Sequence, residues 1–122
     1  MPARLPEFAA FVLDQLSPIP SLSHSRMFGG IGLRAGETFF AILMSGELYF
    51  VVDEQTRREY EALGSGAFTY QKKTGLGISR RYYRVPAEVL DEPERLLAFA
   101  SASIAAVRRG KAPAARRSRR KT

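Results

Sequence analysis

The feature of the sequence that most restricts its fold is a series of short apolar segments between residues 23 and 52, separated by glycine turns. The turns Ala35-Gly36-Glu37 and Ser45-Gly46-Glu47 each lie between β-prone residues, and glycine accepts the positive φ of a tight hairpin. Strands joined by such short turns pair as antiparallel neighbours. The sequence therefore predicts an antiparallel sheet built from consecutive hairpins.

Period-two alternation and β-branched or aromatic content define the individual strands. Residues 23–28 are an extended segment that leads into the sheet. The strands predicted after it lie at 31–34, 39–44 and 48–52.

A second hairpin is predicted from residues 67–72 and 79–85, joined by the loop 73–77. Side chains alternate between the two faces of a strand, so the pairing divides the hairpin into an inner and an outer set. The inner set, if the first strand faces the core, is Phe68, Tyr70, Tyr83 and Val85. The outer set is then Arg80, Tyr82 and Arg84.

Helical periodicity appears in residues 4–16, 53–63 and 91–107. Asp53 is the predicted N-cap of the second helix, because its side chain can accept from an early backbone N–H. Asp91-Glu92-Pro93 opens the third helix with acidic residues and a proline in the first turn. The sequence predicts an α+β fold of two layers, an antiparallel sheet with helices packed on one face, in the order α-β-β-β-α-β-β-α.

The net charge of +7 is distributed unevenly. Residues 108–122 hold eight cations and no acid, and residues 66–85 hold five cations and no acid, which leaves −6 on the rest of the chain. The last segment has small residues and paired arginines with little to bury, a composition typical of disorder. We expect a folded domain over residues 1–107 and a disordered basic tail over residues 108–122.

Composition excludes several chemistries. The chain has no cysteine, which removes disulfides, thiolate metal sites and thiol catalysis, and its one histidine, His24, lacks an orienting carboxylate nearby in sequence. Gly30-x-Gly32-x-x-Ala35 matches a dinucleotide fingerprint only formally, because a turn and another strand follow it where that site needs a helix. We expect a protein that is not an enzyme and binds no cofactor or metal.

Localisation also follows from the pattern of hydropathy. The longest apolar run, residues 39–44, is far shorter than the roughly 20 residues of a membrane span. Glu7 and Asp14 interrupt the apolar residues near the N-terminus, unlike a secretory signal. We therefore expect a cytoplasmic protein with no membrane partner.

The basic segments are candidates for nucleic-acid binding. Cations interleaved with an aromatic ring suit single-stranded nucleic acid, because bases stack on rings and cations hold phosphates. The same residues also suit a solvated sheet face that resists edge pairing, and a basic tail also serves as a solubilising extension. The candidate nucleic-acid-binding residues are Lys72, Lys73, Arg80, Tyr82, Arg84, Arg108, Arg109, Lys111, Arg116, Arg117, Arg119, Arg120 and Lys121.

Two blocks of sequence carry a resemblance to a known family. The first is Arg26-Met27-Phe28-Gly29-Gly30-Ile31-Gly32-Leu33, followed by Leu48-Tyr49-Phe50 and Asp53, and the second is Tyr82-Tyr83-Arg84-Val85-Pro86. Over residues 4–107 the chain resembles the N-terminal domain of the TfoX competence-regulator family. The residues that carry this motif are Arg26, Met27, Phe28, Gly29, Gly30, Gly32, Tyr49, Asp53, Tyr83 and Pro86.

The resemblance implies a small α+β fold with a secretion-chaperone-like topology and brings no catalytic residues with it. It also implies a regulatory or adaptor role through protein–protein contacts, although the second, helical domain of the full-length regulators is absent from this sequence. We expect an unidentified protein partner to bind the exposed sheet face or the C-terminal helix, and self-association into a dimer is compatible with the topology. Sequence-independent nucleic-acid binding is the alternative.

Overall fold

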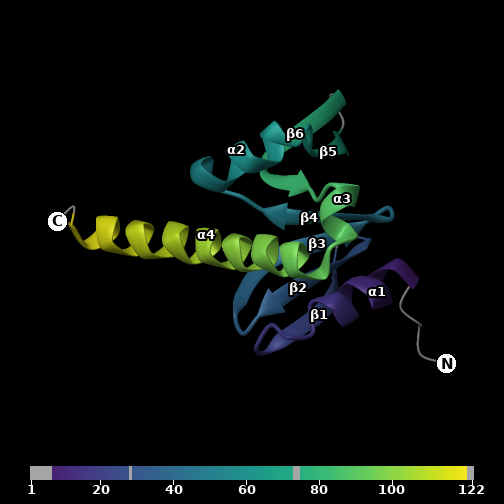
Figure 1. Ribbon diagram of the computed structural model, residues 1–122. Helices are drawn as coiled ribbons and strands as arrows, with labels where there is room; N and C mark the ends of the chain where they lie inside the picture. The colour runs from purple at the N-terminus through teal and green to yellow at the C-terminus, as the bar shows by residue number, and fades with distance from the viewer. Residues whose placement is uncertain (1–6, 28, 73–74, 121–122) are drawn as a thin grey trace.

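The computed structural model describes residues 7–27, 29–72 and 75–120, and the side chains of residues 70–80 and 111–120 lie outside that description. In chain order its elements are α1 (Glu7–Gln15), β1 (Leu22–Met27), β2 (Gly30–Ala35), β3 (Thr38–Met44), β4 (Glu47–Val51), α2 (Glu54–Ala62), β5 (Ala67–Lys72), β6 (Gly75–Arg84), α3 (Ala87–Leu90) and α4 (Pro93–Arg120) (Figure 1).

The strands form a six-stranded antiparallel sheet in the order β1-β2-β3-β4-β6-β5. The hairpin turns predicted at Gly36 and Gly46 are confirmed, and both glycines have positive φ, at 63° and 76°. The strands from β1 to β4 are consecutive neighbours, and β6 rather than β5 pairs with β4. The predicted α+β architecture, with an antiparallel sheet, is therefore confirmed.

The element order differs from the prediction in two places. Four strands precede α2 where the prediction has an extended segment and three strands, because β1 pairs with β2 along its full length. The one-turn helix α3 was not predicted, since four residues are too few to show a helical period. In addition, β6 begins at Gly75, inside the predicted loop.

The prediction that Phe68 faces the core is wrong. Ala67 lies opposite Tyr83, but Phe68 lies opposite Ser79, so the register shifts between the first two residues of β5. A shift of this kind breaks the alternation of side chains on which the prediction depended. The ring of Phe68 lies instead on the other face of the sheet, where its centroid is 6.4 Å from that of Tyr82.

The rest of the second hairpin follows the predicted division wherever its side chains are described. Tyr83 and Val85 face the core and are almost fully buried. Tyr82 lies on the opposite face, as its ring contact with Phe39 shows. The side chain of Tyr70 lies outside the described residues.

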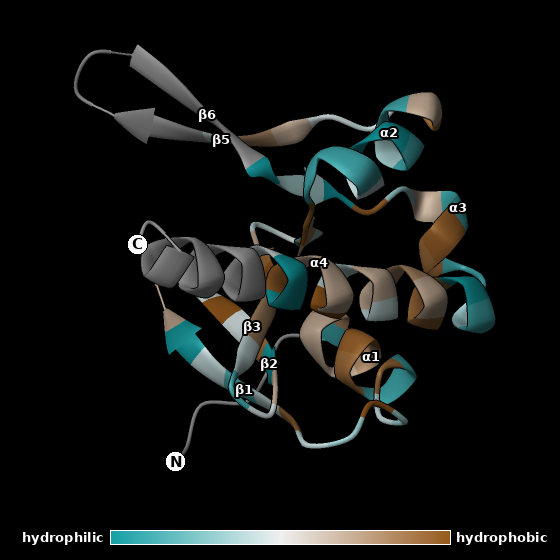
Figure 2. Ribbon diagram, turned by 90° about the vertical axis from the view of Figure 1, so that its left-hand side faces the viewer, coloured by the Kyte–Doolittle hydropathy of each residue, from teal (hydrophilic) through white to brown (hydrophobic). Residues whose placement is uncertain are grey.

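All four helices contribute to one hydrophobic core on a single face of the sheet. In Figure 2, hydrophobic residues (brown) and hydrophilic ones (teal) share α1 and α4, as expected for amphipathic helices. Tyr60 of α2 makes an edge-to-face contact with Phe99 of α4 and a tilted contact with Tyr83 of β6. The largest fully buried side chains are Phe40, Phe50, Leu16, Leu33, Leu48 and Leu96.

The C-terminal helix is longer than the sequence predicts. α4 continues to Arg120, beyond residue 107, and in Figure 1 its last turns extend past the sheet. Arg108 and Arg109, which the sequence assigns to a disordered tail, are helical and contact the folded body through Thr38 and Asp53. Residue 107 is therefore not a helix end, and the division of the chain into a domain and a separate tail stays a prediction.

Membrane insertion of a helix finds no support in the fold. Within the described part of the chain, no helix combines the length and the apolar character needed to cross a bilayer.

A buried hydroxyl ties α4 to the sheet. Ser103 is 1% exposed, and its Oγ lies 2.9 Å from the carbonyl oxygen of Phe40 and 2.8 Å from that of Val51. Phe40 is the extra residue of a bulge, because Leu33 pairs with Ala41 and the next pair is Arg34 with Phe39. The hydroxyl proton is shared between the two carbonyl oxygens, so one side chain fixes the position of α4 over β3 and β4.

Replacing Ser103 with Ala should lower the free energy of unfolding by about 1–3 kcal/mol, because two buried carbonyl oxygens lose their donor. Denaturant titration measures this change. Ser101, which is exposed on the same helix, provides the matched control, and Ser101→Ala should change the stability by less than about 0.5 kcal/mol. Equal effects of the two substitutions would contradict the assigned role.

Candidate interaction surface

The face of the sheet opposite the helices, called here the open face, carries a cluster of aromatic side chains. Its members come from four adjacent strands, and together they form the aromatic patch: Phe39 of β3, Tyr49 of β4, Tyr82 of β6 and Phe68 of β5. All four side chains are half-buried. The helices of the described chain pack on the other face, so this patch faces outward.

The rings of the aromatic patch contact one another edge to face. The centroids of Phe39 and Tyr82 are 6.3 Å apart at 73°, and those of Tyr49 and Phe68 are 4.9 Å apart at 76°. Such geometry is the favoured arrangement of aromatic quadrupoles and adds to the energy of burial. The patch is therefore a continuous apolar surface made of interlocked rings.

Two arginines border the aromatic patch. The guanidinium of Arg34 lies 5.6 Å from the centroid of Phe39, a cation–π contact, and it also donates to Ser25 Oγ at 3.3 Å. Arg84 is paired across the strands with Tyr49. Both side chains are half-buried, and each carries its charge on the guanidinium at the end of an apolar stem.

The pKa of the Tyr49 hydroxyl is raised above its usual value. Burial is the main cause that raises the pKa of Tyr49, and the negative charge of Glu47 raises it further, while Arg84 acts in the opposite direction. Tyr49 is therefore neutral at physiological pH, and its hydroxyl can serve as a hydrogen-bond donor on the open face.

Glycines keep the adjoining part of the open face flat. A Cβ at Gly32 would overlap Met27 Sδ and lie 2.7 Å from Phe39 Cε1, so a larger residue there would have to displace these two side chains. A Cβ at Gly30 would lie 2.4 Å from the carbonyl oxygen of Leu43. The motif glycines thus allow close packing within the sheet, and the chain turns from β2 directly into β3, without the helix that a dinucleotide site requires.

Asp53 connects α2 to α4 on the other side of the sheet. Its Oδ1 accepts from the backbone N–H of Thr56 at 2.9 Å, which confirms the predicted N-cap, and the Thr56 hydroxyl accepts in return from the Asp53 N–H. Its Oδ2 accepts from Nη2 of Arg109 at 2.6 Å. Burial alone would raise the pKa of Asp53, but the hydrogen bonds from Thr56 and Arg109 outweigh it and hold the pKa below its usual value.

The other motif residues have structural positions. Gly29 is in the turn before β2 with φ of 78°, and Arg26 is exposed on β1. Tyr83 is buried and donates from its hydroxyl to Glu61 Oε2 at 2.8 Å. Pro86 is the N-cap residue of α3, and Phe28 lies outside the described residues.

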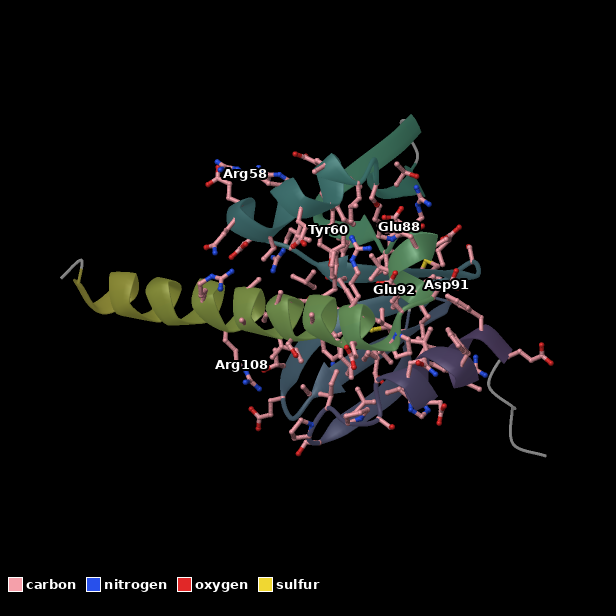
Figure 3. The ribbon with its side chains drawn as sticks, in the orientation of Figure 1. Arg58, Tyr60, Glu88, Asp91, Glu92 and Arg108 are labelled. Atoms are coloured by element: carbon pink, nitrogen blue, oxygen red, sulfur yellow. The ribbon has the colours of Figure 1, made fainter. Side chains whose placement is uncertain are left out.

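The candidate nucleic-acid-binding residues do not form one surface where their side chains are described. Tyr82 and Arg84 lie on the open face, whereas Arg108 and Arg109 lie on α4, over the opposite face. Figure 3 shows Arg108 on α4, away from Arg58 of α2. The candidates whose side chains lie outside the described residues are Lys72, Lys73, Arg80, Lys111, Arg116, Arg117, Arg119, Arg120 and Lys121.

Sequence reasoning missed three residues of the open face: Arg34, Phe39 and Phe68. Arg34 interrupts the apolar residues of β2 and could have been found by strict alternation with Leu33. Phe39 lies in a continuous apolar run, and the bulge at the next residue hides its face from any alternation rule. Tyr49 was named only as a motif residue.

Three further features concern metal binding, the histidine and the surface groove. No group of three or more His, Asp or Glu side chains in the described ranges is close enough to hold a metal ion. His24 is exposed on the edge strand β1. A surface groove of about 840 Å³ lies along α4 beside the loop before β1, and its described lining includes Arg108 and Arg109 but no acidic group or histidine.

The fold and its surfaces define a small two-layer α+β domain whose sheet is covered by helices on one face. Residues 14–107 match the TfoX N-terminal domain. The chain therefore belongs to the TfoX N-terminal domain family, as its two motif blocks indicate. Among curated proteins none matches the chain.

The lowered pKa of Asp53 predicts a pH dependence of stability. The ionised carboxylate contributes stability that is fully present above the unfolded pKa of about 3.9 and is lost as the pH falls through the lower folded pKa. Asp53→Asn keeps the cap acceptor but loses the charge, so the variant should show a smaller loss of stability below about pH 4 than the wild type.

Unfolding titrations at several pH values measure this difference. Glu54→Gln removes a neighbouring exposed carboxylate without touching the contact with Arg109 and provides the control. If the two variants had the same pH profile, the role assigned to the Asp53–Arg109 contact would be wrong.

Proposed function

We propose that this chain is a non-catalytic regulatory domain that acts as an adaptor by binding another protein through the aromatic patch of its open face. The observation that carries the proposal is the set of half-buried rings from four adjacent strands on the face opposite the described helices. Aromatic side chains and arginine are enriched at the centres of protein interfaces.

Family membership supports a regulatory role, since the family takes its description from the N-terminal domain of TfoX competence regulators. Competence regulation itself is part of the proposal. A half-buried aromatic cluster bordered by guanidinium groups has the composition that is enriched at the centres of protein interfaces. A cytoplasmic location suits such a role.

A photo-crosslinking experiment tests the adaptor function in cells. Benzoyl-phenylalanine in place of Tyr49 should form a defined crosslink to a partner, which mass spectrometry then identifies. The same group in place of Arg58, exposed on α2 on the helix side, should not form that crosslink (Figure 3). Equal crosslinking at both positions, or none at Tyr49, would contradict the proposal.

The double variant Tyr49→Ser/Tyr82→Ser removes half of the aromatic patch without touching the core. We expect it to weaken binding of the identified partner by at least about tenfold, because buried tyrosines are frequent hot spots. Titration with the purified partner measures the loss, and circular dichroism verifies the fold. Unchanged affinity in a folded variant would remove the patch from the interface.

Nucleic-acid binding by the C-terminal segment is the second candidate function. The helical path of α4 to Arg120 supports it, because a protruding helix would present the cations of this segment beyond the sheet. Removal of residues 111–122 tests it while retaining the contacts of Arg108 and Arg109 with the fold.

Nucleic-acid binding predicts that this truncation sharply reduces DNA retention in a gel shift, and that retention by the full chain falls steeply between two salt concentrations. The adaptor function predicts no retention that survives moderate salt. Retention that the truncation leaves unchanged would exclude the C-terminal segment as the nucleic-acid site.

A further inference from the structure

The open face has a definite arrangement of charge around its apolar centre. Arg34 on β2 borders the aromatic patch beside Phe39, whereas Arg84 lies on β6 beside Tyr49, and the strand order β2-β3-β4-β6 separates their strands by three spacings. Three strand spacings amount to roughly 14 Å. The open face therefore presents two cations whose strands are separated by β3 and β4, which carry the rings of Phe39 and Tyr49, with Glu47 near Tyr49 as an acidic group.

The contacts of the rings favour a protein ligand over a nucleic acid. Bases bind aromatic side chains by stacking on free ring faces. Here Tyr82 meets both Phe39 and Phe68 edge to face, at 73° and 78°, and the guanidinium of Arg34 lies over Phe39. The rings engage one another and Arg34, which suits an apolar contact surface better than a row of stacking platforms.

A sheet with an apolar face is stabilised when a second layer of secondary structure packs on that face and buries it. Helices form the layer on the opposite face, and an amphipathic helix buries its apolar stripe in the same way when it binds as a partner. Acidic residues about nine positions apart on such a helix would be separated by about 14 Å, at a rise of 1.5 Å per residue. That spacing is the minimum for a helix that reaches both arginines, because the strand registers also offset Arg84 from Arg34 by about three residues along the strands.

We propose that the open face binds an amphipathic helix of a partner protein, with acidic residues at both ends of its apolar stripe that pair with Arg34 and Arg84. The inference rests on the proposed adaptor function and names the chemistry of its partner. The aromatic patch provides the contact area, and the two arginines select acidic helices and set their orientation.

Synthetic helical peptides provide the probe. Peptides of equal length share one leucine-rich stripe and one tryptophan, and differ only in carrying Glu, Gln or Lys at the two ends of the stripe. The protein contains no tryptophan, so tryptophan fluorescence reports the peptide alone. The Glu peptide should bind the full chain at least about tenfold more tightly than the Lys peptide, and added salt should reduce the difference.

Charge reversal tests the assigned residues. In the double variant Arg34→Glu/Arg84→Glu the preference should invert, so that the Lys peptide binds more tightly than the Glu peptide. Arg58→Glu makes a similar charge change on α2 and should leave the wild-type preference intact. An equal effect of the control, or no change in the double variant, would overturn the proposal; should the double variant misfold, Arg34→Gln and Arg84→Gln replace it.

The results separate this inference from the adaptor function. If Tyr49→Ser/Tyr82→Ser weakens all three peptides equally while the arginine variants bind like wild type, the acidic partner is overturned and the interaction surface stands. If the Tyr49→Ser/Tyr82→Ser variant binds every peptide as tightly as the wild type does, the aromatic patch is not the interaction surface. If a single-stranded oligothymidylate binds more tightly than the Glu peptide, the open face binds nucleic acid and the proposal is overturned. If the chain forms a concentration-dependent dimer that the arginine variants dissociate, the open face binds a second copy, which also overturns the proposal.

Discussion

The packing of α4 on one face of the sheet is the constraint on which the other features depend. Its apolar residues, with those of α1, α2 and α3, supply the helix side of the core, and the hydroxyl of Ser103 bonds to carbonyl oxygens of β3 and β4 at the bulge. Because the described helices all pack on this face, none of them covers the aromatic side chains on the other face. One-sided burial thus produces both the stability of the domain and its candidate interaction surface.

The family motif combines residues with different physical tasks. Gly30 and Gly32 allow the strands and the Met27 side chain to pack closely, and Asp53 caps α2 while holding Arg109 of α4. Tyr49 instead belongs to the aromatic patch. Most of the motif therefore maintains the scaffold, and the open face is where function is proposed to reside.

Local chemistry explains what could be predicted from the sequence. Glycine turns predict the hairpins, and an aspartate before a helical stripe predicts the cap, because both effects act within a few residues. The side of the sheet on which Phe68 lies depends on a register shift, and the contact of Arg109 with Asp53 joins residues 56 positions apart. Neither the face on which Phe68 lies nor the contact of Arg109 with Asp53 can be deduced from residues nearby in the sequence. The open face was for this reason only partly predicted, through Tyr82 and Arg84.

The polar character of β1 has a consequence for how the molecule associates. This edge strand exposes Ser23, His24, Ser25 and Arg26 in succession. Charged and polar side chains on an edge discourage the unpaired backbone groups there from recruiting a strand of another molecule. Pairing of β1 with a strand of another molecule is thereby disfavoured, which leaves the proposed association to the surface that the side chains of the open face define.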